Sequence, residues 1–332
     1  MVPCDDVDRL ATICGFDHPE DLDLAAEAGI LVVSEMSILG SRGALAAIEP
    51  RGGRPRRLWP LGDGRDFAPD RRFGDPACAP PDAATFAPHG LTVARGDQLV
   101  VVNHGGRESL ELFALEGRGA TARAIWRGCI ELPSGTSGND VVVAPNGDLL
   151  VTNYLPSLLS FWGGLKVLLG METGDVLSWR RDRGWEHVPG SESSGPNGIV
   201  VSPDGQWMLF SETGTGKVVR LARDSSRRDE VEIGGAPDNL TWTNDGRVLA
   251  TSHDSLLAFF TSCRRGKSCP APWTLFEIDP RSLTAETLLH HDGTRIGTVT
   301  TALQVGSDIW LGAILSDRIG RWRGARSAAV VP

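Results

Sequence analysis

The sequence predicts an all-β protein, a single six-bladed β-propeller spanning residues 1–332, and three observations lead to this fold. Six segments of similar pattern follow one another, and their repeat of about 45 residues suits a four-stranded propeller blade. Hairpin turns recur inside these segments as Asn-Gly and Asp-Gly pairs. The chain also has 40 glycines and 21 prolines, a composition that favours many turns and short strands.

Each segment contains an apolar strand, a turn, a second apolar strand, a loop and a third strand. The first segment runs through residues 29–35 and 43–49, and the first strands of the other five are expected to begin near the following residues: His89, Asn139, Asn197, Asn239 and Val299. The turns at 145–147, 203–205 and 244–246 are strong hairpin signals. Residues 121–126 and 230–233 are expected to form fourth strands.

The sixth segment has no clear strand after Trp322. We therefore expect a strand at residues 10–14 to complete the last blade and lock the ring shut. A right-handed parallel β-helix is the competing fold, but its rungs are shorter and lack hairpin turns.

The composition is that of a soluble globular protein, with 41% hydrophobic and 23% charged residues. A net charge of −9 and the lack of a long basic run argue against a nucleic-acid partner. No apolar stretch reaches the roughly 18 residues needed to cross a bilayer, so stable membrane insertion is not expected. A small-molecule partner is the remaining expectation.

The six cysteines allow three disulfides with 15 possible connectivities. The expected pairs are Cys4–Cys14, Cys78–Cys129 and Cys263–Cys269, and the alternative is a set of scattered buried thiols. Disulfides indicate an oxidising compartment. The chain starts Met-Val-Pro-Cys without an apolar signal stretch. One interpretation is a cytoplasmic protein; the second is a secreted or periplasmic protein whose signal was removed before residue 1. We expect the second.

One apolar segment, residues 155–171, interrupts the third repeat after its second strand. It is expected to form one or two helical turns on the face of the ring. Phe161, Trp162 and Leu165 would then bind an apolar part of a substrate as a wall or lid. A packed structural helix and a membrane-associated segment are the alternatives, and Gly163-Gly164 weakens the helix.

Oxygen-bearing side chains recur just before the first strands of the repeats. Because these strands start near the axis of a propeller, the side chains should converge at the mouth of its channel. Carboxylate and amide oxygens are the ligands of hard cations, Ca²⁺ foremost. The expected ligands of a first, catalytic ion are Glu20, Asn139, Asn197, Asp238 and Asn239. Asp21, Asp140 and the carbonyl of Leu91 would hold a second ion deeper in the channel. For any single pair, an ordinary turn is the alternative interpretation.

Three histidines have comparable positions. His89 lies just before the first strand of the second blade, His104 follows the second strand of that blade, and His253 has a similar place in the fifth blade. A neutral histidine beside a metal can activate water as a general base. No Gly-x-Ser-x-Gly and no His-Glu-x-x-His motif is present, so nucleophilic-serine and zincin chemistry are not indicated.

An ordered set of stretches resembles the paraoxonase family of calcium-dependent lactonases and arylesterases, within the senescence-marker-protein/gluconolactonase superfamily. The stretches are 19–24, 88–91, 101–104 with 110–113, 139–141, 197–205 and 238–240. The resemblance implies a six-bladed propeller with one catalytic and one structural Ca²⁺, held by the residues named above. It also implies that His89 activates water with His104 as its partner, and that His253 is a further active-site histidine. The chain departs from the family in having no cysteine after Cys269.

The sequence thus favours a calcium-dependent hydrolase of lactones, and of aryl esters or organophosphates as further substrates. A non-enzymatic ligand- or protein-binding propeller with structural calcium is one alternative. A single-metal enzyme resembling gluconolactonase or strictosidine synthase is another, since fold analogy does not choose between these functions.

Overall fold

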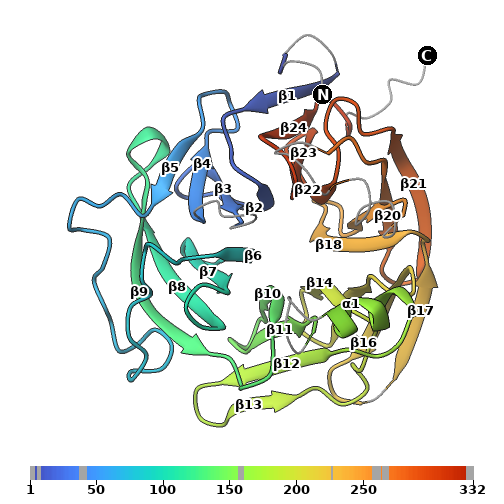
Figure 1. Ribbon diagram of the computed structural model, residues 1–332, viewed down its shortest axis with the longest axis horizontal. Coiled ribbons are helices and arrows are strands. Elements are labelled where there is room, and N and C mark those ends of the chain that lie inside the picture. Colours follow the sequence, from blue (N-terminus) through green and yellow to red (C-terminus); the bar gives the residue numbers. More distant parts are fainter. Residues whose placement is uncertain are drawn as a thin grey trace.

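The computed structural model describes residues 4–5, 9–36, 43–155, 161–225, 227–255, 263 and 269–326. Their strands form six four-stranded antiparallel sheets arranged as blades around one axis (Figure 1). The sequence-based prediction of a six-bladed β-propeller is therefore confirmed. In each blade the earliest strand in the chain lies innermost, except that β1 joins the last blade from the outside.

The blades contain the following strands. Blade 1 has β2 (Pro19–Ala25), β3 (Ile30–Glu35), β4 (Ala44–Ile48) and β5 (Arg56–Trp59). Blade 2 has β6 (Pro88–Ala94), β7 (Gln98–Asn103), β8 (Ser109–Glu116) and β9 (Arg123–Glu131), with a 3-10 turn at Gly119–Thr121. Blade 3 has β10 (Gly138–Val143), β11 (Leu149–Asn153), β12 (Asp175–Arg180) and β13 (Gly184–His187). Blade 4 has β14 (Pro196–Val201), β15 (Trp207–Glu212), β16 (Lys217–Ala222) and β17 (Arg228–Glu232). Blade 5 has β18 (Ala236–Trp242), β19 (Val248–His253), β20 (Trp273–Asp279) and β21 (Thr284–His291). Blade 6 has β22 (Val299–Val305), β23 (Asp308–Ala313), β24 (Arg318–Trp322) and β1 (Leu10–Cys14).

The two ends of the chain meet in blade 6. Strand β1 pairs antiparallel with β24, from Leu10 opposite Trp322 to Cys14 opposite Arg318. This confirms the expectation that residues 10–14 complete the last blade. The N-terminal and C-terminal parts of the chain are thus hydrogen-bonded to one another within a single sheet, which closes the ring.

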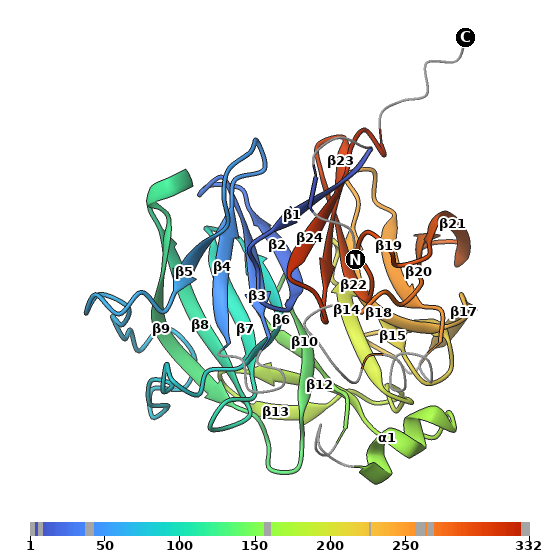
Figure 2. The same cartoon turned by 45° about the horizontal axis from the view of Figure 1, so that its top comes forward.

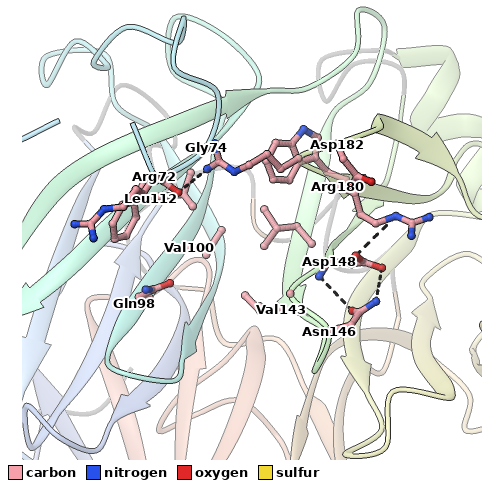
Figure 3. Close-up of a pocket in the computed structure, with 15 residues that line it drawn as sticks. Arg72, Gly74, Gln98, Val100, Leu112, Val143, Asn146, Asp148, Arg180 and Asp182 are labelled. Atoms are coloured by element: carbon pink, nitrogen blue, oxygen red, sulfur yellow. Dashed lines mark hydrogen bonds and ion pairs between the residues drawn. The ribbon is translucent and has the colours of Figure 1, made fainter. Parts of the chain in front are cut away.

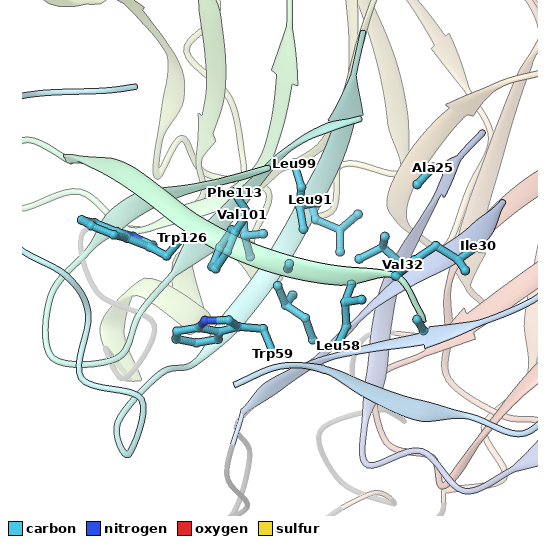
Figure 4. Packing of buried hydrophobic residues seen from close by; sticks show 14 of the residues in the cluster. Ala25, Ile30, Val32, Leu58, Trp59, Leu91, Leu99, Val101, Phe113 and Trp126 are labelled. Carbon is cyan, nitrogen blue, oxygen red and sulfur yellow. The ribbon is translucent and has the colours of Figure 1, made fainter. Parts of the chain in front are cut away.

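Apolar side chains fill the space between neighbouring blades. Figure 4 shows the cluster between blades 1 and 2, where the Trp59 ring lies edge-on to Phe86 and Phe113 at centroid distances of 4.7 and 5.3 Å. These rings are almost completely buried. Packing between sheets therefore fixes the angle at which each blade meets the axis.

Three disulfides join Cys4 to Cys14, Cys78 to Cys129 and Cys263 to Cys269, so all three expected pairs are confirmed. The Cys78–Cys129 bond ties the long connection between blades 1 and 2 to β9. Three disulfides are compatible with an extracellular location. Among the described residues, no helix combines the length and apolarity required to cross a membrane.

Two glycines allow the innermost strands to approach one another at the axis. A Cβ atom on Gly90 would lie 2.5 Å from the carbonyl oxygen of Asn139, and one on Gly198 would lie 2.4 Å from the Cα of Asn239. Both glycines directly follow a predicted site residue, His89 and Asn197. The close contact between neighbouring blades thus depends on the absence of a side chain at these positions.

We expect Gly198→Ala to lower the free energy of unfolding by about 1–3 kcal/mol, because the new methyl group overlaps backbone atoms of the next blade. Gly164→Ala is the matched control, since a Cβ there meets nothing within 4 Å. That change should leave stability equal or raise it by about 0.5–1 kcal/mol in a helix. Urea unfolding followed by intrinsic fluorescence measures both. Equal effects of the two substitutions would contradict the close-packing argument.

Candidate functional site

The predicted ion ligands and His89 lie at a shared irregularity of the six innermost strands. The pairing register shifts between Pro19 and Asp21, and equivalent shifts occur in the other five blades: Pro88/Leu91, Gly138/Val141, Pro196/Ile199, Pro237/Leu240 and Val299/Thr301. A bulge re-aims the side chains of the residues within it. The expectation that these residues precede the strands is corrected in this detail, because they lie within the strands, at the bulge.

Four oxygen atoms at these bulges are buried, and no described residue donates a hydrogen bond to them. They are Glu20 Oε2, Asn139 Oδ1, Asn197 Oδ1 and Asn239 Oδ1. Each belongs to a different blade, namely blades 1, 3, 4 and 5. Leaving a buried polar oxygen without a partner costs about 1–3 kcal/mol. Four such acceptors around one axis would be satisfied by a cation or by a ligand that donates hydrogen bonds.

Neighbouring side chains fix the orientation of two of these amides. Asn239 Nδ2 donates to Glu20 Oε1 at 3.0 Å. Asn197 Nδ2 donates at 3.2 Å to Thr213 Oγ1, whose own hydrogen is donated to the Pro237 carbonyl at 2.8 Å. In both residues the amide nitrogen is thus occupied, and Oδ1 is the atom left without a donor.

The carboxyl groups at this level repel one another. Burial raises the pKa of Glu20 well above its usual value, and the charges of Asp21, Asp238 and Asp140 raise it further. A buried carboxyl group loses its proton readily only if a positive charge or hydrogen-bond donors compensate it. Two carboxylates and three amide oxygens fit a hard divalent cation of the Ca²⁺ type.

No group of three His, Cys, Asp or Glu side chains in the described part of the chain is arranged to hold a metal. The fit to a cation therefore depends on the amide oxygens of Asn139, Asn197 and Asn239. These oxygens suit Ca²⁺ and disfavour a zinc or copper site, whose ligands would be histidine or cysteine.

A second group of carboxylates lies deeper along the axis. Asp21 accepts hydrogen bonds from the backbone N–H groups of Leu22 and Leu91 at 2.8 and 2.9 Å, and Asp140 accepts from those of Val141 and Ile199 at 2.7 and 2.8 Å. Each carboxylate thus connects its own strand to the innermost strand of the next blade. Leu91 contacts Asp21 through its N–H group.

Asp23, two residues after Asp21, repeats this arrangement one step further along β2. It accepts from the N–H groups of Leu24 and Val93, each at 2.7 Å. Burial raises the pKa of Asp21 to about 7 and that of Asp23 to about 6, although the backbone donors oppose the rise. Asp21, Asp23 and Asp140 line a cavity of about 190 Å³ together with residues of the other innermost strands.

The predicted histidines of blade 2 form a connected row. His89 Nδ1 lies 2.9 Å from His104 Nε2, and His104 Nδ1 lies 2.8 Å from Glu108 Oε2. The other ring nitrogen of His89, Nε2, lies 3.8 Å from Glu20 Oε1. Burial and the neighbouring His104 lower the pKa of His89 well below its usual value, so this ring is neutral near pH 7. The sequence did not single out Glu108.

The third histidine lies on the other side of the axis. His253 Nε2 is 3.0 Å from Asp238 Oδ2, at the end of β19. Tyr154, the only tyrosine, lies close enough to Asp238 for that charge to act on it, and burial together with this charge raises the Tyr154 pKa. Tyr154 therefore stays a hydrogen-bond donor. It was not predicted as a site residue, because nothing in the sequence around it marks it beyond its position after β11.

The apolar insertion lies on the same face as the bulges, because Gly138 at the start of β10 pairs with Asn153 at the end of β11. Its helix α1 (Phe161–Leu168) projects from this face (Figure 2). Val167 is buried near Gly195, whereas Trp162 is 71% exposed and Leu165 is 36% exposed. The side chain of Phe161 and residues 156–160 lie outside the described part of the chain.

A larger cleft of about 690 Å³ lies away from the axis, between blades 2 and 3 (Figure 3). Its charged side chains have partners within the chain: Arg180 faces Asp148 at 3.9 Å, and Arg72 pairs with Asp70 at 2.6 Å. The cleft contains none of the bulge residues or histidines described above. We assign no chemistry to it.

No protein-family model and no curated protein matches this sequence at a significant level. Solved structures do resemble it in fold. A gluconolactonase from Xanthomonas campestris superposes with a TM-score of 0.58 at 17% identity, covering 94% of this chain and 88% of that one. A luciferin-regenerating enzyme has a TM-score of 0.59 at 13% identity, covering 94% of both chains. A streptogramin B lyase has a TM-score of 0.54 at 12% identity, covering 94% and 96%. At these identities the likeness establishes the fold alone.

In the presence of a chelator, the free energy of unfolding should fall as the pH rises from about 4 to about 7. In the unfolded chain Asp21 and Asp23 ionise near pH 4. In the folded protein their pKa values are about 7 and 6, so the folded state binds more protons in this window and loses stability as the pH rises.

Urea unfolding in EDTA at several pH values within this window measures the slope. Asp23→Asn should reduce it, because the amide does not titrate. A free energy of unfolding that stays level or rises across the window in the unaltered protein would contradict the burial of protonated carboxyl groups.

Proposed function

We propose that this protein is a calcium-dependent hydrolase of lactones, resembling the paraoxonases in its site residues. The observation that carries the proposal is the pairing of two features at one place. Four buried oxygens without donors lie at the bulges of four innermost strands, and the neutral ring of His89 has its Nε2 atom 3.8 Å from the carboxylate of Glu20. Lactonase neighbours with the same fold support the reaction class without assigning it.

The proposed ligands of the catalytic ion are those predicted from the sequence, Glu20, Asn139, Asn197, Asp238 and Asn239. When bound, Ca²⁺ supplies a Lewis acid that polarises the ester carbonyl and stabilises the negative charge developing on its oxygen. Glu20 and Asp238 contribute two negative charges, which balance a divalent ion. The three asparagines contribute neutral oxygens, two of which are fixed in orientation by Glu20 and Thr213.

A second, structural Ca²⁺ is proposed at Asp21, Asp140 and the Leu91 carbonyl. Each carboxylate oxygen of the two aspartates accepts one backbone N–H group. Each therefore retains one lone pair, which suffices for an ion ligand. This inner site has fewer unsatisfied atoms than the outer one, so its proposed role is to hold neighbouring blades together.

The proposed base is His89, with His104 behind it. The Nε2 atom of neutral His89 removes a proton from a water molecule while the water oxygen bonds to the lactone carbonyl carbon. The ring C–O bond then breaks, and the proton held at Nε2 passes to the departing alkoxide oxygen. The product is a hydroxy acid, and both the ion ligands and His89 return to their initial state. His253 is proposed to orient Asp238 through the bond at 3.0 Å.

The apolar face of α1 is proposed to contact the body of the substrate through Phe161, Trp162 and Leu165. The exposure of Trp162 and Leu165 on the face that carries the bulges supports this role. Aryl esters and organophosphates are included as further candidate substrates, because a polarised carbonyl or phosphoryl oxygen and an activated water serve both classes. A secreted or periplasmic location is proposed from the three disulfides.

Hydrolysis of a small lactone panel and phenyl acetate should be lost in EGTA and restored by added Ca²⁺. The ion is needed to polarise the carbonyl group, so its removal by EGTA should abolish activity, and its return should restore activity. Release of acid, followed with a pH indicator, measures turnover. Activity that is unchanged in EGTA, or an absence of activity in folded, calcium-loaded protein, would refute the proposed function.

Substitutions should separate the ion ligands from the base. Asn197→Ala is expected to weaken Ca²⁺ binding in calorimetry and abolish turnover, because it removes an inward-facing oxygen. His89→Gln should retain Ca²⁺ and lower turnover by about 10²–10⁴-fold, the range for removal of a general base. His187→Gln is the control, since that ring is exposed on β13. Full activity of His89→Gln would remove His89 from the mechanism.

A further inference from the structure

Glu108 lies at the outer end of the histidine row. His104 and Glu108 are the two ends of the short loop 104–108 that connects β7 and β8. Glu108 places both carboxylate oxygens near His104 Nδ1, at 3.0 and 2.8 Å. The ring of His104 then lies within hydrogen-bonding distance of His89, at 2.9 Å. The three side chains form one continuous chain that ends at His89 Nε2 beside Glu20.

The carboxylate determines which nitrogens carry protons. An ionised carboxylate only accepts hydrogen bonds, so His104 must carry its proton on Nδ1 to donate to Glu108. In the neutral ring Nε2 is then an acceptor, and His89 must donate to it from Nδ1. A neutral His89 consequently has a free lone pair on Nε2, the atom nearest the axis. The reverse tautomers would place a hydrogen on His89 Nε2 and leave it unable to accept a proton.

We propose that Glu108 is a positioning residue that sets the tautomers of His104 and His89, so that His89 Nε2 faces the reaction as a proton acceptor. The inference rests on the proposed function and extends it by one residue. Glu108 is not among the proposed ion ligands, and it acts through His104. The role is that of the acidic member of a hydrolytic triad, with a second imidazole interposed between acid and base.

The surroundings of Glu108 hold it in place without neutralising it. Ser137 Oγ donates to Glu108 Oε1 at 3.3 Å, and the backbone N–H of Leu132 donates to the Glu108 carbonyl at 2.9 Å. The adjacent Arg107 is directed elsewhere, since its guanidinium binds Glu111 at 2.9 Å and the Ala79 carbonyl at 2.6 Å. The arginine next to Glu108 in the sequence therefore interacts with another carboxylate, and Glu108 remains available to His104.

The loop itself is built around a buried amide. Asn103 is fully buried, and its Nδ2 donates to the Gly105 carbonyl at 3.1 Å while its Oδ1 accepts from the Gly105 N–H at 3.0 Å. Gly105 passes so close to blade 2's preceding connection that a Cβ atom would lie 1.7 Å from the Thr85 carbonyl oxygen. These contacts fix the loop conformation and, with it, the separation of His104 and Glu108.

The test combines ¹⁵N NMR of histidine-labelled protein with steady-state kinetics on lactones. In the unaltered protein, His104 and His89 should both show Nδ1 protonated and Nε2 unprotonated, with assignments made from His104→Gln and His89→Gln. Glu108→Leu should convert both rings to a mixture of tautomers. Glu108→Gln keeps an acceptor oxygen of the same shape, so it should shift the tautomers less. Nε2 protonation of His104 in the unaltered protein would overturn the proposal.

The kinetic arm separates positioning from binding. Glu108→Leu should lower kcat by about 10–100-fold with KM within about twofold, the scale seen when an outer hydrogen-bond partner is removed. Glu108→Gln should lie between Glu108→Leu and the unaltered protein. Glu116→Gln is the control, because Glu116 is an exposed carboxylate on β8 that pairs with Arg127. Unchanged kcat and unchanged tautomers in Glu108→Leu would contradict the role of Glu108.

The NMR arm needs no substrate. If the unaltered protein hydrolyses no lactone, the proposed hydrolase function fails, while the tautomer assignment is still decided by the spectra. If the protein is active and the spectra show the reverse tautomers, the function stands and the inference about Glu108 fails.

Discussion

The burial of several carboxyl groups around one axis is the constraint on which the rest of this structure depends. Burial raises the pKa of Glu20, and the charges of Asp21, Asp238 and Asp140 raise it further. Bringing them out of water is unfavourable unless donors or a cation compensate. Asp21 and Asp140 accept hydrogen bonds from backbone N–H groups of their own blade and of the next blade. These hydrogen bonds compensate the buried charge and also connect neighbouring blades. In the outer group, Asn239 donates to Glu20 Oε1 and His253 contacts Asp238, but Glu20 Oε2 and three asparagine oxygens accept from no described residue.

The convergence of the ion ligands at the axis was predictable from the sequence, because they recur at equivalent positions of the repeats. Residues such as Asn139 and Asn197 occupy the same phase of successive repeats, and closure of the ring brings equal phases to one axis. The bulges were not predictable, since the register shift at Pro196/Ile199 depends on pairing with β15, which a local pattern does not contain. Asp23 had a signal that was overlooked: it lies two residues after Asp21 on a strand, hence on the same face.

Glu108 shows a different limit. Its partner His104 is only four residues away, but the sequence between them predicts no particular loop conformation. The contact depends on Asn103 folding the loop back on itself and on Arg107 being drawn to Glu111, and both are tertiary effects. The position of Tyr154 beside Asp238 could not be predicted either, because the two residues belong to different blades that closure of the ring brings together. Side chains at the axis can be predicted from their position within each repeat. Side chains that contact those residues from other loops or blades cannot.

Comparison with proteins of the same fold does not assign a function to this chain, because proteins with different functions share the propeller. A gluconolactonase, a luciferin-regenerating enzyme and a streptogramin B lyase share the ring at 12–17% identity. A shared ring does not determine the chemistry, which depends on the residues of the site that the ring carries. Under the proposed assignment, Glu20 and Asp238 provide two negative charges and three asparagines add none, so a divalent ion leaves the outer site neutral. A third carboxylate in place of Asn197 would give that site a net negative charge, directly above Asp21 and Asp140. Under that assignment, amides at three of the five outer positions would keep the charge of the outer site low enough for a second acidic group to lie next to it.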